Sequence, residues 1–163
     1  MPNTLAEAAP QGPKDCAMET DLDVLIPDTY VSNTSERLQL YAKLDSVKDE
    51  PALQKLVAGI QDRFGPLPAE VEHLVQIVRL RWMALGLGFE KLTLKKETLR
   101  GYIPTENNER YFQGQTFGNI LKWVQAHSRK SRLKELKGKL NVIVENVANL
   151  EGAREVLEGL KEG

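Results

Sequence analysis

The stretch IQDRFGPLP, at residues 60–68, separates two segments whose apolar residues recur at helical spacing. Gly65 suits the left-handed conformation that ends many helices, and Pro66 prevents the first helix from continuing. Pro68 fits the first turn of a second helix, where its missing N–H is harmless. The apolar stripes are Leu53, Leu56, Val57, Ile60 and Phe64 before the break, and Val71, Leu74, Val75, Val78, Trp82 and Leu85 after it. The sequence therefore predicts two helices joined by a tight corner.

A further helical segment precedes this pair. Asn33 with Glu36 resembles a capping box, and an apolar stripe follows at helical spacing. Asp49 can cap the next helix, with Pro51 in its first turn. The glycines in residues 86–88 end the last helical segment. Three consecutive helices are therefore predicted.

Alternating apolar and polar residues predict strands on both sides of the helices. Residues 16–27 alternate, which favours a strand that ends at Pro27. Residues 89–103 alternate in two runs, which predicts a hairpin that turns around Glu97. Residues 105–115 have no periodicity and are predicted to be a loop.

The last third of the chain returns to helical and strand patterns. Thr116 is a possible cap for a helix, residues 132–136 allow a short strand, and the β-branched residues of 140–147 predict a buried strand. A closing helix would turn a regular set of side chains inward: Leu150, Ala153, Val156, Leu157 and Leu160.

These patterns predict an α+β fold of approximate order β-ααα-ββ-α-β-α. Three consecutive N-terminal helices would be joined to a small mixed or antiparallel sheet with two further helices. Residues 1–14 lack periodicity and are expected to be a flexible lead or a linker remnant. Residues 15–163 are expected to form a single α+β domain.

The amino-acid composition bears on the cellular compartment of the protein and on the classes of partner that it binds. The net charge of −1 gives the whole chain no electrostatic preference for nucleic acid or membrane. The single cysteine, Cys16, excludes an internal disulfide and a cysteine-based zinc cluster, and it fits a reducing compartment. No apolar run approaches the ~20 residues that span a bilayer, and the N-terminus lacks a signal-peptide pattern. A cytoplasmic protein without a membrane partner is expected.

No motif in the chain carries catalytic chemistry. His73 and His127 have no neighbouring ligand residues at metal-binding spacing. Residues 86–91, GLGFEK, lack the spacing of a phosphate-binding loop and follow a helix rather than a strand. We therefore expect no catalytic, cofactor-binding or metal-binding residue, although an enzyme with an unrecognised site stays open as an alternative.

A basic stretch at residues 127–139 offers a different kind of site. Its cations include Arg129, Lys130 and Arg132, which could contact phosphates of a nucleic acid. The stretch contains no aromatic residue on which a base could stack. A nucleic-acid-binding accessory module is thus one reading of the chain, and a solvated connector is the other.

Three segments give the chain a family resemblance. They are IPDTYVSNTSERLQLYAKL, IQDRFGPLPAEVEHLV and RLRWMALGLGFEKL. In this combination they resemble the C-terminal domain of the bacterial transcription-repair coupling factor, a large ATP-dependent DNA translocase that displaces stalled RNA polymerase and recruits excision repair. The resemblance runs from about Asp15 to the end of the chain, and it is looser over the later strands and the final helix.

The resemblance implies a regulatory role. In the family, the motifs that use ATP and Mg²⁺ lie upstream, so this chain would be an excised terminal domain without a cofactor of its own, and Met1 would be an expression start. The domain docks on the N-terminal excinuclease-B-like module of the same protein. Docking masks the surface that binds the excinuclease A subunit and restrains the translocase until it engages stalled polymerase. DNA would be contacted through the rest of the parent protein.

The resemblance also assigns the docking residues. The family's contact is made by acidic residues on the helix that ends in DRFG, and Asp62 matches one of them. The acidic position one turn earlier corresponds to Gly59, so one expected charge is missing here. Asp62 lies off the apolar stripe of its helix and should be exposed, whereas Arg63 could serve a structural role at the corner.

Overall fold

The structure is a computed structural model that describes residues 15–163. The expectation for residues 1–14 lies outside this range. The described residues divide into two compact units: residues 22–79, which we call the helical unit, and residues 15–21 with 80–163, which we call the sheet unit. The expectation that residues 15–163 form one domain stays a prediction. Each unit is described on its own below.

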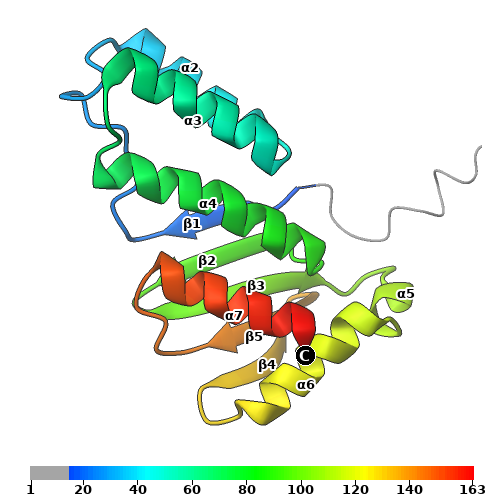
Figure 1. The fold of residues 1–163 in the computed structure, drawn as a ribbon. Coiled ribbons are helices and arrows are strands. Elements are labelled where there is room, and N and C mark those ends of the chain that lie inside the picture. The colour runs from blue at the N-terminus through cyan, green and yellow to red at the C-terminus, as the bar shows by residue number, and fades with distance from the viewer. Residues whose placement is uncertain (1–14) are drawn as a thin grey trace, which may run out of the picture. The chain divides into compact units, whose positions relative to one another are not determined.

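The helical unit contains the three predicted helices (Figure 1). They are α2 (Thr34–Ser46), α3 (Glu50–Phe64) and α4 (Ala69–Gly86), whose residues as far as Arg79 belong to this unit. The Asn33 side chain accepts a hydrogen bond from the Glu36 N–H at 2.9 Å, and that of Asp49 accepts one from the Ala52 N–H at 2.9 Å. Both predicted N-terminal caps are therefore confirmed.

The corner between α3 and α4 is fixed by backbone conformation and by one tyrosine. Gly65 has a φ of +95°, and its N–H donates to the Gln61 carbonyl at 2.8 Å. The Tyr30 hydroxyl donates to the Gly65 carbonyl at 2.6 Å, and its ring lies 5.8 Å from that of Phe64. Helix α4 begins directly after Pro68, as predicted. The corner therefore depends on residues of the IQDRFGPLP stretch and on Tyr30, which lies earlier in the chain.

Removing the cap of α3 should weaken this unit. We expect Asp49→Ala to lower the free energy of unfolding by about 1 kcal/mol, because the Ala52 N–H loses its acceptor. Denaturant titration with backbone hydrogen exchange of α3 would measure the loss. Asp49→Ser retains a capping oxygen and should stay near the wild-type value. Equal losses in the two variants would contradict the capping role.

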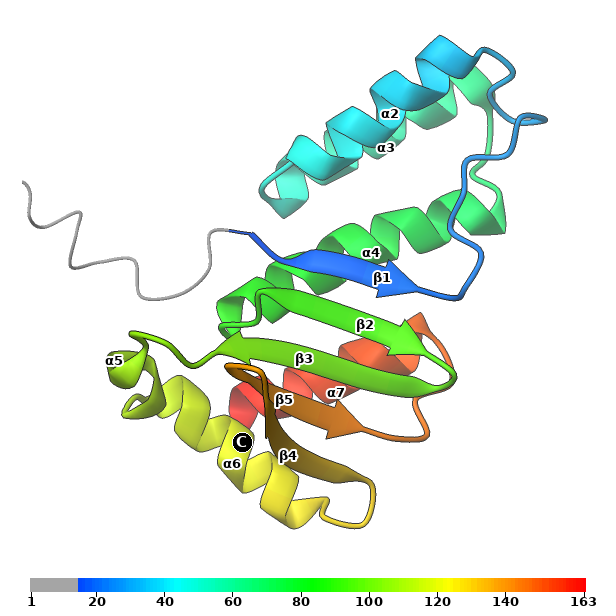
Figure 2. The same cartoon turned by 180° about the vertical axis from the view of Figure 1, so that it is seen from behind.

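The sheet unit is built on a mixed sheet of five strands in the order β1-β2-β3-β5-β4 (Figure 2). Strand β1 pairs in parallel with β2, and the other pairs are antiparallel. The strands are β1 (Ala17–Thr20), β2 (Lys91–Lys95), β3 (Thr98–Pro104), β4 (Ser131–Leu136) and β5 (Lys139–Val144). The predicted α+β class with a mixed sheet is confirmed. The hairpin turns at Lys96 and Glu97, whose φ values of 51° and 59° suit a two-residue turn.

Several elements differ from the sequence expectation. Strand β1 ends at Thr20 rather than at Pro27, and Asp21 accepts the Lys96 N–H at 2.8 Å where the pairing stops. A short helix, α5 (Glu109–Phe112), lies in the predicted loop. Helix α6 (Gln115–Ala126) begins after Gly114, so Thr116 lies inside the helix and does not cap it. Two strands, β4 and β5, follow α6, so the possible strand at 132–136 is real.

The helices of the sheet unit cover one face of the sheet. Strand residues that alternate along β2, β3 and β5 are buried on this face: Leu92, Leu94, Leu99, Ile103, Val142 and Val144. Helix α7 (Leu150–Glu162) buries all five of its predicted inward residues. Figures 1 and 2 show α7 behind the sheet in one view and in front of it in the other, and no helix of the described sheet unit crosses the opposite face.

Candidate functional site

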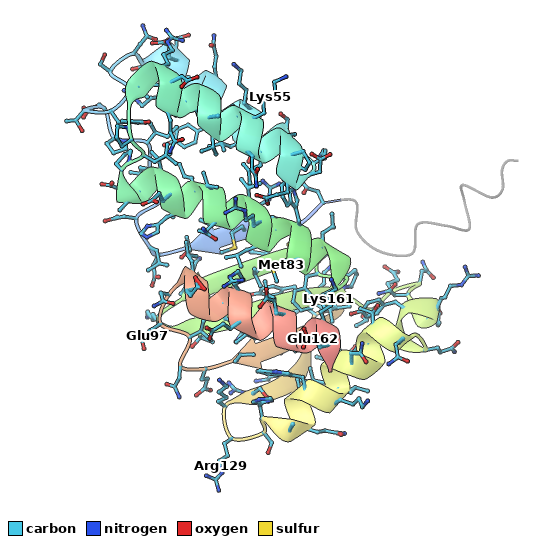
Figure 3. The ribbon with its side chains drawn as sticks, in the orientation of Figure 1. Lys55, Met83, Glu97, Arg129, Lys161 and Glu162 are labelled. Carbon is cyan, nitrogen blue, oxygen red and sulfur yellow. The ribbon has the colours of Figure 1, made fainter. Side chains whose placement is uncertain are left out.

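The outward face of α3 carries the predicted docking residues. Leu53 and Ile60 point into the core with 0% and 4% of their surface exposed. Gly59 and Asp62 lie on the opposite side of the helix and are exposed. Lys55, labelled in Figure 3, is exposed on the same side, one turn before Gly59. The structure therefore brings Gly59 and Asp62 onto one solvent-facing surface, which we call the α3 surface.

The acid and the base at the end of α3 have different surroundings. Within residues 15–163, no ion pair or side-chain hydrogen bond holds the Asp62 carboxylate. Arg63 instead pairs with Glu36 of α2, and its guanidinium lies 5.1 Å from the centroid of the Phe64 ring. Arg63 thus joins α2 to the end of α3. The sequence did not indicate Glu36 as its partner. Asp62 keeps a carboxylate available to another molecule.

Gly59 leaves room for a side chain on the α3 surface. A Cβ atom built on Gly59 would meet no heavy atom within 4 Å. Packing within this chain therefore does not require glycine there. Gly59 adds no charge to the α3 surface, and Lys55 adds a positive one.

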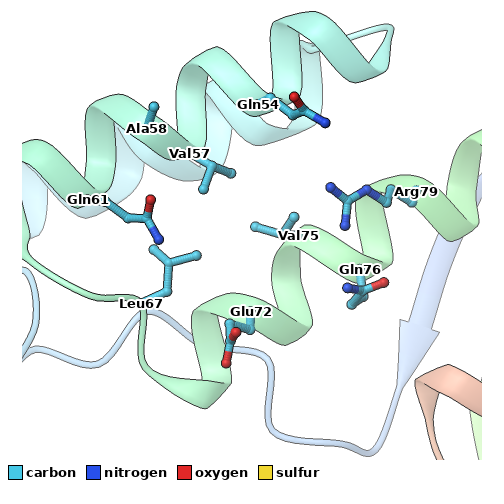
Figure 4. Close-up of a pocket in the computed structure, with 9 residues that line it drawn as sticks. All are labelled: Gln54, Val57, Ala58, Gln61, Leu67, Glu72, Val75, Gln76 and Arg79. Atoms are coloured by element: carbon cyan, nitrogen blue, oxygen red, sulfur yellow. The ribbon is translucent and has the colours of Figure 1, made fainter.

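A groove lies beside this surface, between α3 and the first turns of α4 (Figure 4). Its volume is about 260 Å³. The lining is Gln54, Val57, Ala58, Gln61, Leu67, Glu72, Val75, Gln76 and Arg79. Arg79 donates two hydrogen bonds to Glu50, at 2.9 and 2.7 Å, and these hold the pKa of the Glu50 carboxyl below its usual value. Asp62 is not among the lining residues, so the groove and the α3 surface are separate features.

The three cations predicted to contact nucleic acid lie in different settings. Arg129 extends from the turn after α6 into solvent (Figure 3). The Lys130 ammonium lies 5.9 Å from the centroid of the Trp123 ring. Arg132 lies on β4 and pairs with Glu145 at 2.5 Å. Contact of this stretch with nucleic acid stays a prediction, and the structure does not gather the three side chains into one cluster.

The open face of the sheet gathers cations that a linear scan does not reveal. Arg132 and Lys134 on β4 share this face with Arg100 on β3 and with Lys91 and Lys95 on β2. The alternation of charged and apolar residues along β2 and β4 was the available signal. Pairing register between strands was needed to bring those positions together.

The two histidines contact other groups of the chain, and the cysteine is buried. The His73 ring contacts the Asp23 carbonyl at 3.0 Å, and the His127 ring stacks on Trp123 at 3.9 Å. Burial raises the pKa of the Cys16 thiol to about 12, which opposes a nucleophilic role. The described residues hold no group of three or more side chains placed to bind a metal ion. No helix within residues 15–163 is long and apolar enough to cross a membrane.

Comparison with known proteins identifies relatives of the chain. The family model of the TRCF domain matches residues 20–113. Transcription-repair-coupling factors of Rickettsia prowazekii and Staphylococcus haemolyticus are 29% and 30% identical over 69% and 72% of this chain. The Escherichia coli protein of the same name is 36% identical over 46% of this chain. These alignments span only 10%, 10% and 6% of the relatives' own lengths.

The fold also has a solved counterpart. A crystal structure of the C-terminal domain of transcription-repair coupling factor superposes with a TM-score of 0.71 and 20% sequence identity. The alignment covers 95% of this chain and 98% of that one. On the family match and on this fold, the chain belongs to the transcription-repair coupling factor family and has the fold of its C-terminal domain.

Proposed function

We propose that this chain is a non-catalytic regulatory domain of a coupling factor and acts by binding protein. It docks through the α3 surface on the N-terminal excinuclease-B-like module of its parent protein. Docking masks the site for the excinuclease A subunit and restrains the ATP- and Mg²⁺-dependent translocase. RNA polymerase and DNA are engaged by other parts of the parent. The observation that carries the proposal is the exposed Asp62 carboxylate, which has no partner within the described residues.

The local architecture supports a docking role for this carboxylate. Asp62 stands in the last turn of a helix capped by Asp49 and stopped by Gly65, so its position is fixed. A carboxylate without a local partner keeps its interaction energy for a basic side chain of another molecule. Such complementary charges set specificity and orientation more than they set affinity.

The charges of the α3 surface point to a weak latch. Of the three exposed residues Lys55, Gly59 and Asp62, only Asp62 is negatively charged. A modest closing free energy suits regulation, because a partner that prefers the open state can then shift the equilibrium. The domain would hold the parent closed until stalled polymerase competes.

Restoring the missing acid tests this proposal. We expect Gly59→Glu to tighten binding of this chain to the excinuclease-B-like module by about three- to tenfold, which is roughly 0.7–1.4 kcal/mol. The open space around Gly59 accepts the side chain without strain. Isothermal titration calorimetry would measure the affinity.

Gly59→Gln is the matched control, since it adds a side chain of the same length without the charge. It should bind as the wild type does. If the wild-type chain fails to bind the module, or if both variants tighten binding equally, electrostatic docking through the α3 surface is wrong.

A further inference from the structure

The open face of the sheet presents two adjacent rows of side chains across four strands, all polar except Ile143, with Thr93, Asn141 and Ile143 buried. One row runs Lys91, Tyr102, Asn141 and Lys134, and the next runs Thr93, Arg100, Ile143 and Arg132. Each row crosses three inter-strand spacings of about 4.8 Å, so it extends over roughly 14 Å. Figure 2 shows this face of the sheet toward the viewer. We call it the cationic face.

Cations exceed carboxylates on the cationic face. Six basic side chains stand on it among the described residues: Lys91, Lys95, Arg100, Arg132, Lys134 and Lys139. Three carboxylates pair with four of them: Glu19 with Lys91 and Lys95, Glu145 with Arg132, and Glu90 with Lys139. The whole chain carries a net charge of −1, so positive charge is concentrated here.

Two cations on this face have no carboxylate partner within residues 15–163. The Arg100 guanidinium donates to the Asn141 side-chain oxygen at 3.2 Å, which orients it and leaves other N–H donors free. Lys134 is exposed on β4 and has no ion pair in the described part of the chain. Register places these two side chains on adjacent rows, with β5 between their strands.

A hollow and an aromatic ring complete the surface. The hollow has a volume of about 310 Å³ and is lined by Thr93, Lys95, Lys96, Thr98, Arg100, Arg132 and Glu145. Tyr102 lies in the neighbouring row, half-buried, with the Lys91 ammonium 5.5 Å from its ring centroid. An aromatic plane beside free guanidinium donors can hold a base and its phosphate together.

We propose that the cationic face binds single-stranded nucleic acid laid across β2, β3, β5 and β4. Phosphates contact Arg100 and Lys134, and a base stacks on Tyr102. A sheet suits an extended strand with splayed bases, whereas reading a duplex requires an element that enters a groove. The surface shares Lys134 with the basic stretch at 127–139, but its other principal contacts, Arg100 and Tyr102, come from β3, which lies outside that stretch. It is also independent of docking through α3.

Fluorescence anisotropy with a labelled oligothymidylate of about 20 nucleotides tests this surface. We expect binding at about 50 mM salt that weakens toward 200 mM. The double variant Arg100→Gln with Lys134→Gln should weaken binding at least about tenfold and reduce the magnitude of the salt slope by about 1.4, since each phosphate contact on a single strand contributes roughly 0.7. Tyr102→Leu should weaken binding about fivefold or more with an unchanged slope.

A second pair of lysines provides the control. Lys55→Gln with Lys161→Gln removes the same charge from α3 and α7, neither of which supplies a side chain to the cationic face. This variant should bind as the wild type does, and circular dichroism would show that every variant is folded.

Four results would overturn the proposal. They are no binding at low salt, equal losses in the two double variants, stronger binding of the matching duplex, and displacement of the oligonucleotide by polyglutamate at equal charge. The last result would make the face a docking surface for acidic protein.

Discussion

Replacing Gly101 with valine is expected to destabilise the sheet unit by about 3 kcal/mol. Gly101 lies in β3, and a Cβ atom there would stand 2.3 Å from Cε2 of Phe89. The Phe89 ring is only 1% exposed, so it has no free space into which it can move. Relief would require a shift of the strand, which is paired on both sides. Denaturant unfolding would show a lower midpoint.

Gly118→Ala supplies the control for this prediction. Gly118 lies in α6, and a Cβ atom there would meet nothing within 4 Å. Alanine should raise the free energy of unfolding by roughly 0.5–1 kcal/mol, because it orders more easily in a helix than glycine. A wild-type midpoint for Gly101→Val would mean that Phe89 does not lie against the strand.

The elements that the sequence predicted correctly depend on near neighbours. Asn33, Asp49 and Gly65 act within one turn of their own helices, and each acts as predicted. The inward face of α7 follows from helical spacing alone, and its predicted residues are all buried. Local rules were sufficient wherever one helix supplied both the residue and its partner.

The elements that the sequence missed depend on distant partners. Leu22, Val24 and Ile26 continue the alternation of β1, but the Ile26 N–H donates to the Tyr41 hydroxyl at 2.7 Å in the helical unit. The alternation was therefore read as one strand, although the chain leaves the sheet after Thr20. The close approach of the Phe89 ring to Gly101 is a similar case, since no residue of β3 indicates it. Competing tertiary contacts decided both positions.

The candidate site divides in the same way. Exposure of Asp62 followed from the apolar stripe of α3, because a residue off the stripe faces away from the core. The pairing of Arg63 with Glu36 did not, since the two residues come from different helices. The sequence did not predict the cationic face, because its cations are spread over several strands and become neighbours only through the pairing register.

In the full-length coupling factor, Asp62→Lys is expected to open the proposed latch. Reversing the charge removes an attraction and adds a repulsion, and a change of about 1.4–2.8 kcal/mol would shift the closed-to-open ratio by roughly ten- to a hundredfold. The expected result is stronger capture of the excinuclease A subunit and faster ATP hydrolysis without stalled polymerase. Pull-down and steady-state ATPase assays would measure the two effects.

Glu155→Lys is the matched control, because it makes the same charge change at an exposed position of α7. Equal behaviour of Glu155→Lys and Asp62→Lys would contradict the latch. Asp62→Asn separates two kinds of contact. If docking is electrostatic, neutralisation should have about half the effect of reversal, and added salt should reduce the difference. If docking instead depends on steric packing of the Asp62 side chain against its partner, both substitutions would act alike at any salt concentration. Among Lys55, Gly59 and Asp62 only Asp62 carries a negative charge, so we expect this position to show the difference.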